Sequence, residues 1–325
     1  MRLLTRSPAL CALAAVAMFA GCSGGGTSSI APVPPSASSS RHLASNYSCP
    51  ATGSLKYVSD LFYNVVNVYV GNFSGQAPCG QIASTSLRFP TGLYVQPATH
   101  DLYVANQGGH NVLVFHRGQA DPYNTYIDPT GQLPNDVTVA GDGTVLAANY
   151  ISFTKNEGSI STWIPGPSGG TFIGNFPETH SNQGAHIAIK NNGRIYFDDV
   201  DLPNNLQGFV WSLLCPAGAC GAQHRVRGVV LKFPGGMAFD NTGDLLIIDS
   251  MAPTADTFEL PNPGPSTFPI AGFPDAMAMS NHDHQMFVIN GNHNDAEEYS
   301  YPDGALIGTV NGQQDSILAG IAVDK

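Results

Sequence analysis

The sequence predicts an all-β fold, a six-bladed β-propeller of four-stranded antiparallel blades. Three observations predict it. A short strand pattern recurs six times at a spacing typical of propeller blades. The 325 residues include 36 Gly and 24 Pro, which favours many short strands joined by tight turns. The last copy of the pattern lacks the strands that should follow it, and the N-terminal part of the chain supplies matching ones.

The recurring pattern is a four-residue inner strand with large apolar residues at its second and fourth positions. Ala occupies the third position in four copies, which indicates a strand of period two with a small side chain where neighbouring sheets crowd. The copies begin 40 to 50 residues apart. They are Gly92–Val95, Asp136–Val139, His186–Ile189, Gly236–Phe239, Ala276–Met279 and Gly320–Val323.

Each of the first five inner strands is followed by a turn and a second strand, and then by a third strand that carries aromatic residues in four blades. We expect second strands within 100–106, 143–149, 193–199, 243–249 and 284–290. We expect third strands at 112–115, 160–163, 209–212 and 298–301. The fourth strands have a weaker pattern.

The sixth copy ends with the chain at Lys325 and has no second strand after it. Leu55–Asp60 matches the second-strand pattern, and Val65–Tyr69 matches the third. We therefore expect the N-terminal strands to complete the blade that the C-terminus begins. This arrangement closes the ring, so that no sheet edge is left exposed. A seventh blade would need a seventh inner strand, and the sequence has none.

The unit G-x-A-V-D, G-x-L-Y-V-A-D, N-x-V-x-V-Y resembles the NHL-repeat and gluconolactonase-like group of six-bladed propellers. The resemblance covers residues 49–325. It implies the architecture but not the activity, because propellers of this group serve as enzymes, receptors and scaffolds.

Residues 1–22 are typical of an export signal. Arg2 and Arg6 form a positive start, and an apolar run that is too short to span a bilayer follows them. Phe19 to Cys22 resembles a bacterial lipobox, with an ordinary cleaved signal as the alternative. Lipidation of Cys22 implies a lipid-anchored protein of the cell envelope. Because Ser23 is not Asp, the resemblance implies the outer membrane.

A flexible Gly/Ser/Pro-rich tether is predicted over residues 23–48. The Cys residues of the remaining chain are Cys49, Cys79, Cys215 and Cys220. An even number in an exported chain indicates disulfides, and we expect the pairs Cys49–Cys79 and Cys215–Cys220. A four-Cys metal site is the alternative, but no C-x-x-C pair is present.

The formal net charge is −11, and only 11% of the residues are charged. This argues against a nucleic-acid partner, since phosphate binding needs clustered Lys and Arg. We expect a monomer that contacts the membrane only through its lipid. Its partner would be a protein, a glycan or a small ligand held on the loop face, the face on which the inner strands begin.

An Asp or Asn ends every second strand, close to the loops that lead into the inner strands. These six residues would ring the mouth of the central channel, where Ca²⁺ or another divalent cation is a conceivable cofactor. The alternative is structural, because such side chains accept hydrogen bonds from loop amides. The six are Asp60, Asn106, Asn149, Asp199, Asp249 and Asn290.

The loops that lead into the inner strands differ from one another, and two resemble those of the gluconolactonase family. By that resemblance, Asn135 would contact a substrate and Asp275 would bind a metal. The family's metal-binding Glu and Asn should fall near Thr91 and Ala185, and both are missing. The candidate ligand-binding residues are Asn135, Asp136, His186 and Asp275, and the candidate metal ligands are Asp199, Asp249 and Asp275.

Three histidines, His110, His186 and His293, also fall on the loop face, with His180 nearby. One could serve as the base of an elimination like that of the virginiamycin B lyase group, although those propellers have seven blades. No G-x-S-x-G, H-E-x-x-H or phosphate-loop motif is present. We therefore predict a cell-envelope binding or scaffold module and no catalytic residues. The alternative is a metal-dependent hydrolase of the gluconolactonase-like group with a degenerate site.

Overall fold

The structure of this chain is a computed structural model. It describes residues 47–150, 158–166, 169–178, 184–201, 207–252, 254–258, 265–280 and 284–324. The predicted export signal with Cys22, the tether up to residue 46, and His180 lie outside the described residues.

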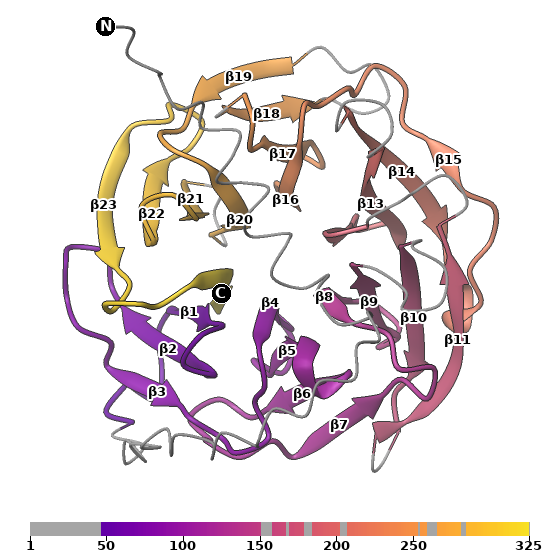
Figure 1. Cartoon of the computed structure of the whole chain (residues 1–325), viewed down its shortest axis with the longest axis horizontal. Helices are drawn as coiled ribbons and strands as arrows, with labels where there is room; N and C mark the ends of the chain where they lie inside the picture. The colour runs from indigo at the N-terminus through magenta and orange to yellow at the C-terminus, as the bar shows by residue number, and fades with distance from the viewer. Residues whose placement is uncertain are drawn as a thin grey trace, which may run out of the picture. The chain divides into compact units, whose positions relative to one another are not determined.

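The described chain forms six four-stranded antiparallel sheets, each a propeller blade (Figure 1). Blade 1 contains β4 (Pro90–Val95), β5 (Leu102–Asn106), β6 (Asn111–Phe115) and β7 (Asn124–Ile127). Blade 2 contains β8 (Pro134–Val139), β9 (Val145–Asn149), β10 (Ser159–Ile164) and β11 (Thr171–Pro177). Blade 3 contains β12 (Ile187–Ile189), β13 (Arg194–Asp201), β14 (Gln207–Leu214) and β15 (His224–Arg225).

Blade 4 contains β16 (Pro234–Phe239), β17 (Leu245–Asp249), β18 (Thr254–Phe258) and β19 (Pro265–Pro269). Blade 5 contains β20 (Pro274–Met279), β21 (Gln285–Asn290), β22 (Asp295–Ser300) and β23 (Leu306–Asn311). Blade 6 contains β24 (Leu318–Asp324), β1 (Leu55–Asp60), β2 (Val65–Val70) and β3 (Gly80–Ile82). Two short 3₁₀ helices, η1 (Gln107–Gly109) and η4 (Pro216–Gly218), lie in loops.

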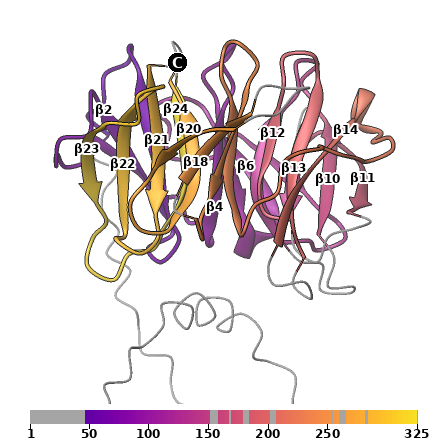
Figure 2. The ribbon, with the colours of Figure 1, turned by 90° about the horizontal axis from the view of Figure 1, so that it is seen from above.

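The six predicted inner strands are confirmed, since each is the first strand of its blade. Each also contacts the inner strand of the blade on either side, in the closed cycle β4, β8, β12, β16, β20, β24 and back to β4. The inner strands therefore surround one central axis. Figure 2 shows the ring from the side, with the strands running through its thickness.

The predicted closure by the two ends of the chain is confirmed as well. β24 pairs antiparallel with β1, with Leu55 opposite Asp324 and Ser59 opposite Gly320. In Figure 1 the yellow C-terminal strand accordingly lies beside indigo β1. β24 is the innermost strand of its blade, and β1 pairs with β24 on one side and with β2 on the other, so the two ends of the chain close the ring within one sheet.

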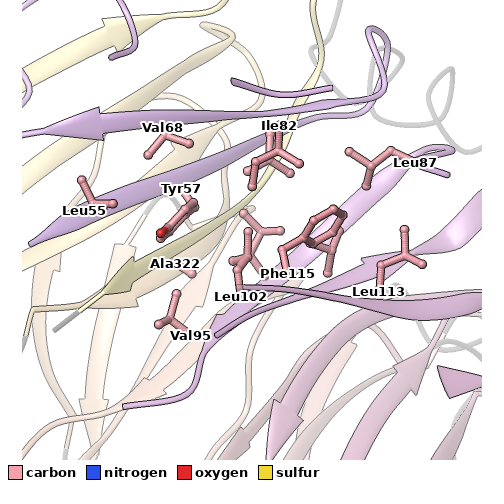
Figure 3. Packing of buried hydrophobic residues seen from close by; sticks show 13 residues of the cluster. Leu55, Tyr57, Val68, Ile82, Leu87, Val95, Leu102, Leu113, Phe115 and Ala322 are labelled. Carbon is pink, nitrogen blue, oxygen red and sulfur yellow. The ribbon is translucent and has the colours of Figure 1, made fainter. Parts of the chain in front are cut away.

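Six hydrophobic clusters fill the spaces between neighbouring blades. The cluster between blades 6 and 1 joins Tyr57 and Val68 to Leu102 and Phe115, all of them at most 1% exposed (Figure 3). Burial of one such large apolar side chain stabilises the fold by about 1.5–3 kcal/mol. The alternating pattern of the inner strands explains how two clusters are served at once. Their large residues face one neighbour and their small third residues face the other.

Both expected disulfides are formed. Cys49–Cys79 links the start of the described chain to the segment before β3, and Ser48 donates its amide to the Cys79 carbonyl at 2.9 Å. Cys215–Cys220 closes a loop between β14 and β15. Since all four thiols are paired, the four-Cys metal site is not supported.

The third strand of blade 5 differs from the expected range 298–301, because β22 begins at Asp295 and ends at Ser300. Three of the first four residues of this strand, Asp295, Glu297 and Glu298, are acidic and mask the apolar pattern. All three are nevertheless buried. Among the described residues, no helix is long and apolar enough to cross a membrane.

Candidate functional site

Polar residues break the repeat pattern where the inner strands begin, and these strands surround the axis. At the first position of the inner-strand pattern, four blades have Gly or Ala, whereas blades 2 and 3 have Asp136 and His186. The position before it carries Asn135 in blade 2 and Asp275 in blade 5. We call these four residues, together with Asp198 of β13, the axial cluster.

His186 is held by Asp198, whose carboxylate is completely buried. Asp198 Oδ2 lies 2.7 Å from His186 Nδ1, and Oδ1 accepts hydrogen bonds from the amides of Ala185 and His186 at 2.9 and 2.8 Å. The carboxylate is thus fixed by two backbone donors, and it in turn fixes the imidazole ring with Nε2 directed away from it.

Asp136 joins blade 2 to blade 3. Its Oδ1 accepts from the amide of Val137 at 2.8 Å, and its Oδ2 accepts from the amide of Ile187 at 3.0 Å. The neighbouring inner strand leaves room for this carboxylate only because it has Gly92 there. A Cβ at Gly92 would lie 2.2 Å from Asp136 Oδ1.

Asn135 links three blades beside Asp136. Its Nδ2 donates to the carbonyl of Ala185 at 2.8 Å, and its Oδ1 accepts from Gln107 Nε2 of η1 at 3.4 Å. The side-chain amide is therefore oriented by contacts on both sides, which makes it part of the scaffold of the axial cluster.

Three carboxylates set the charge of His186. Burial by itself lowers the pKa of His186, but attraction to Asp198, Asp275 and Asp136 outweighs it and raises the pKa to about 9. At neutral pH this histidine is therefore a cation.

Burial acts on the carboxyl groups in the opposite direction, because it raises their pKa values. Burial raises the pKa of Asp136 to about 6, against the attraction of His186. Burial also raises the pKa of Asp275, with His186 lowering it and Asp198 raising it further. Both keep part of their surface accessible. One imidazolium faces three carboxylates, so the axial cluster has an excess of negative charge at neutral pH.

The six Asp and Asn residues predicted to end the second strands are all buried and hydrogen-bond within or beside their own blades. Five of them end their strands, whereas β13 continues past Asp199 to Asp201. Asp60 accepts from the amides of Phe62 and Tyr63, both at 3.1 Å. Asp249 accepts from the amides of Lys232 and Phe233 at 2.8 and 3.1 Å. These bonds hold loops in place, as the structural interpretation of the six residues predicts.

The other members of this set behave similarly. Asn106 Oδ1 accepts from the Arg88 amide at 2.6 Å, and Asn290 Oδ1 accepts from the Phe273 amide at 3.1 Å. Asn149 Nδ2 donates to two serine hydroxyls, and Asp199 Oδ2 accepts from Trp211 Nε1 at 3.2 Å. Of the three candidate metal ligands, the structure therefore places Asp275 in the axial cluster and gives Asp199 and Asp249 partners elsewhere.

Asp198 was missed by the analysis of the sequence, although a signal for it exists. It stands one residue before the Asp or Asn that recurs in every second strand, and that position is small or apolar in every other blade. The set is Ser59, Ala105, Ala148, Asp198, Ile248 and Ile289. A carboxylate at a position that faces a neighbouring blade needs a partner, and the partner is His186.

The remaining loop-face histidines lie apart from this pair. His110 Nδ1 contacts the carbonyl of Gln132 at 3.1 Å. His293 Nδ1 contacts Asn290 Nδ2 at 3.1 Å in blade 5.

No protein family model matches the chain, and no curated protein matches it. Solved structures do. A chain of a Nidogen/Laminin complex has a TM-score of 0.65 at 11% identity, over 84% of this chain and 99% of that one. A protein of unknown function from Bacteroides caccae has a TM-score of 0.59 at 12% identity, over 84% and 100%.

A catalytically inactive His-to-Ala variant of virginiamycin B lyase from Staphylococcus aureus, solved with quinupristin, has a TM-score of 0.58 at 10% identity. The match covers 83% of this chain and 85% of that one. At these identities the comparisons show the propeller fold alone, and the neighbours include both a binding module and lyases.

Proposed function

We propose that this chain is an exported binding module whose axial cluster takes a cationic group, an ammonium or guanidinium, of a small ligand. The single observation that carries the proposal is the placement of Asp136 and Asp275 beside the buried pair of His186 and Asp198. Asp136 and Asp275 are each partly exposed as residues, so a cation can approach the axial cluster while protein surrounds the rest of the site.

The charge of His186 favours binding over base catalysis. A general base works best when its pKa lies near the operating pH. An imidazole with a pKa of about 9 is protonated at neutral pH, so it can orient and balance the carboxylates but cannot accept a proton there. Its contribution to the site is therefore electrostatic.

The expected location supports the same function. A lipid on Cys22 and the tether of residues 23–48 would hold the module at the outer membrane, where it can meet small ligands. The Nidogen/Laminin complex supports the idea that a propeller of this size can act by binding.

Calorimetry with the purified mature chain tests the proposal. The probes are 1,4-diaminobutane and the neutral analogue 1,4-butanediol. We expect the diamine to bind and the diol not to bind, and we expect Asp275→Asn to weaken diamine binding at least tenfold. The matched control is Asp142→Asn, which neutralises an exposed turn carboxylate away from the axis and should leave the affinity unchanged.

Binding should also weaken as Asp136 is protonated below pH 6. Equal affinity of the two probes, or unchanged diamine affinity in Asp275→Asn, would refute the assignment of the axial cluster as a cation site.

A metal-dependent hydrolase of the gluconolactonase-like group is the second candidate, favoured by Asn135 and Asp275 both lying at the axis. The rest of that group's ligand set does not fit. Ala185 has no donor side chain, and the Thr91 hydroxyl is within hydrogen-bond distance of the carbonyls of Ala105 and Pro134, at 3.1 and 3.2 Å. A divalent ion that copurifies with the chain and is lost in Asp275→Asn, together with lactone hydrolysis, would favour this candidate over the binding module.

A further inference from the structure

The turn between β21 and β22, together with the start of β22, carries a second cluster of charged groups, in blade 5. His293 lies in the turn, and Asp295 and Glu297 are alternate residues of β22, so their side chains share one face of the strand. Tyr299 on the same face belongs to the hydrophobic cluster between blades 4 and 5. The three groups thus lie on the side of blade 5 that faces blade 4.

Burial makes the two carboxylates unusual. Asp295 is 8% exposed and Glu297 is 3% exposed. Asp295 Oδ1 has no hydrogen-bond partner among the described residues. An unpaired buried carboxylate oxygen is unfavourable, so this atom is available to a ligand from outside the chain.

No Lys or Arg within the described part of the chain forms an ion pair with either carboxylate; the basic group beside them is His293. Its Nδ1 lies 3.8 Å from Glu297 Oε1, and half of its side chain is exposed. The two carboxylates raise each other's affinity for a positive charge, because like charges at close range disfavour ionisation. A cation from solvent would relieve this repulsion.

The neighbouring side chains orient the donors. Asn290 Oδ1 is fixed by the Phe273 amide, so its Nδ2 faces Glu297 Oε1 at 3.3 Å and His293 Nδ1 at 3.1 Å. Tyr299 donates its hydroxyl to Glu297 Oε2 at 2.5 Å. Such contacts hold a carboxylate in place, as the outer shell of a metal site does.

We propose that His293, Asp295 and Glu297 form a binding site for a first-row divalent transition metal ion. One donor atom from each residue lies within 4.8 Å of the other two, so a small contraction brings all three to coordination distance. The half-exposed imidazole leaves the site open to solvent, which allows an ion to enter and water to complete the coordination.

The donor types select the class of ion. Ca²⁺ and Mg²⁺ are bound through oxygen atoms, whereas imidazole is a good ligand for Zn²⁺ and its neighbours in the first row. One imidazole with two carboxylates is therefore a set for Zn²⁺, Mn²⁺ or Co²⁺. The site is separate from the axial cluster and does not depend on the proposed function.

Titration of the metal-free mature chain with Zn²⁺ and Co²⁺, followed by calorimetry and visible absorption, tests the proposal. We expect one ion per chain at the site, a Co²⁺ absorption band typical of a protein nitrogen and oxygen site, and a higher Tm with Zn²⁺. His293→Ala and Asp295→Asn should each weaken Zn²⁺ binding at least tenfold. Because His293 is half exposed, His293→Ala should fold normally even if Asp295→Asn does not.

The matched control is His116→Ala. His116 is also a largely exposed histidine beside a carboxylate, with its Nδ1 2.8 Å from Asp101 Oδ1, but it has no third donor of this kind. This variant should keep the full affinity. The proposal is overturned if Zn²⁺ affinity is unchanged in His293→Ala, if His116→Ala reduces it equally, or if the wild-type chain binds no ion.

Discussion

His186 interacts with three carboxyl groups. One of them, Asp198, is fully buried, accepts hydrogen bonds from the amides of Ala185 and His186, and lies 2.7 Å from His186 Nδ1. The other two belong to Asp136 and Asp275, which are partly exposed as residues and which we propose bind the ligand. At the scale of single residues, Asp198 thus holds the charged His186 in place, and Asp136 and Asp275 are the carboxylates that we propose bind the cation.

The raised pKa of His186 makes stability depend on pH. A histidine whose pKa is about 9 in the folded chain and about 6.5 in the unfolded chain stabilises the fold fully below pH 6.5, and this stabilisation is lost as the pH rises through 9. We expect the difference in unfolding free energy between the wild type and His186→Gln to shrink by about 3 kcal/mol from pH 6 to pH 10. Urea denaturation of both proteins across this range measures it, and a constant difference would show that folding does not raise the pKa of His186.

The prediction of secondary structure succeeded where the chain repeats itself and failed where charge replaces apolar side chains. The inner strands were predictable because their period of two, with a small third residue, recurs six times. The start of β22 was not, because Asp295 and Glu297 occupy positions where apolar residues are expected. Burial of those carboxylates depends on tertiary contacts that no local pattern reports.

Four residues of the axial cluster were predictable because they depart from the repeat. The repeat has mostly small residues at the start of its inner strands, and polar or charged residues replace them at Asn135, Asp136, His186 and Asp275. Asp198 was not found, because Asp199 follows it directly, at the position that is Asp or Asn in every blade. Which of two adjacent carboxylates faces His186 depends on strand register, and the structure decides it.

Gly92 of β4 shows how closely the inner strands approach one another. A Cβ there would lie 2.2 Å from Asp136 Oδ1 and 2.6 Å from Asp136 Cα, so Gly92→Ala must displace β8 and the carboxylate with it. We expect a loss of about 1–3 kcal/mol in unfolding free energy together with weaker diamine binding. Gly141→Ala is the control, since a Cβ at that glycine meets nothing within 4 Å. Similar unfolding free energies of the two variants would mean that β4 and β8 can move apart to admit a Cβ at little cost.

At the scale of the whole molecule, the pairing of β24 with β1 turns a row of blades into a ring. β24 contacts the inner strands of blades 1 and 5 as well as β1, so its residues contribute to the hydrophobic clusters on both sides of blade 6. Loss of this strand would leave blade 6 with an open edge and expose two clusters to water.

Removal of residues 318–325 should therefore abolish cooperative unfolding and cause association of the chain. The matched control is a circular permutant that begins at Leu318 and continues through a linker into Tyr47, which keeps the same strand pairs in one blade and the Cys49–Cys79 disulfide. Chemical denaturation and light scattering compare the two. A truncated chain that unfolds cooperatively as a monomer would contradict the role assigned to the closure.

The central claim is that the inner strands bring a charged histidine and three carboxylates together at one end of the axis. The most direct test is an NMR titration of the His186 imidazole in the wild type and in Asp198→Asn. The account predicts a pKa of about 9 for His186 in the wild type and a clearly lower pKa once the Asp198 charge is removed. A His186 pKa at or below 6.5, unchanged in Asp198→Asn, would contradict it.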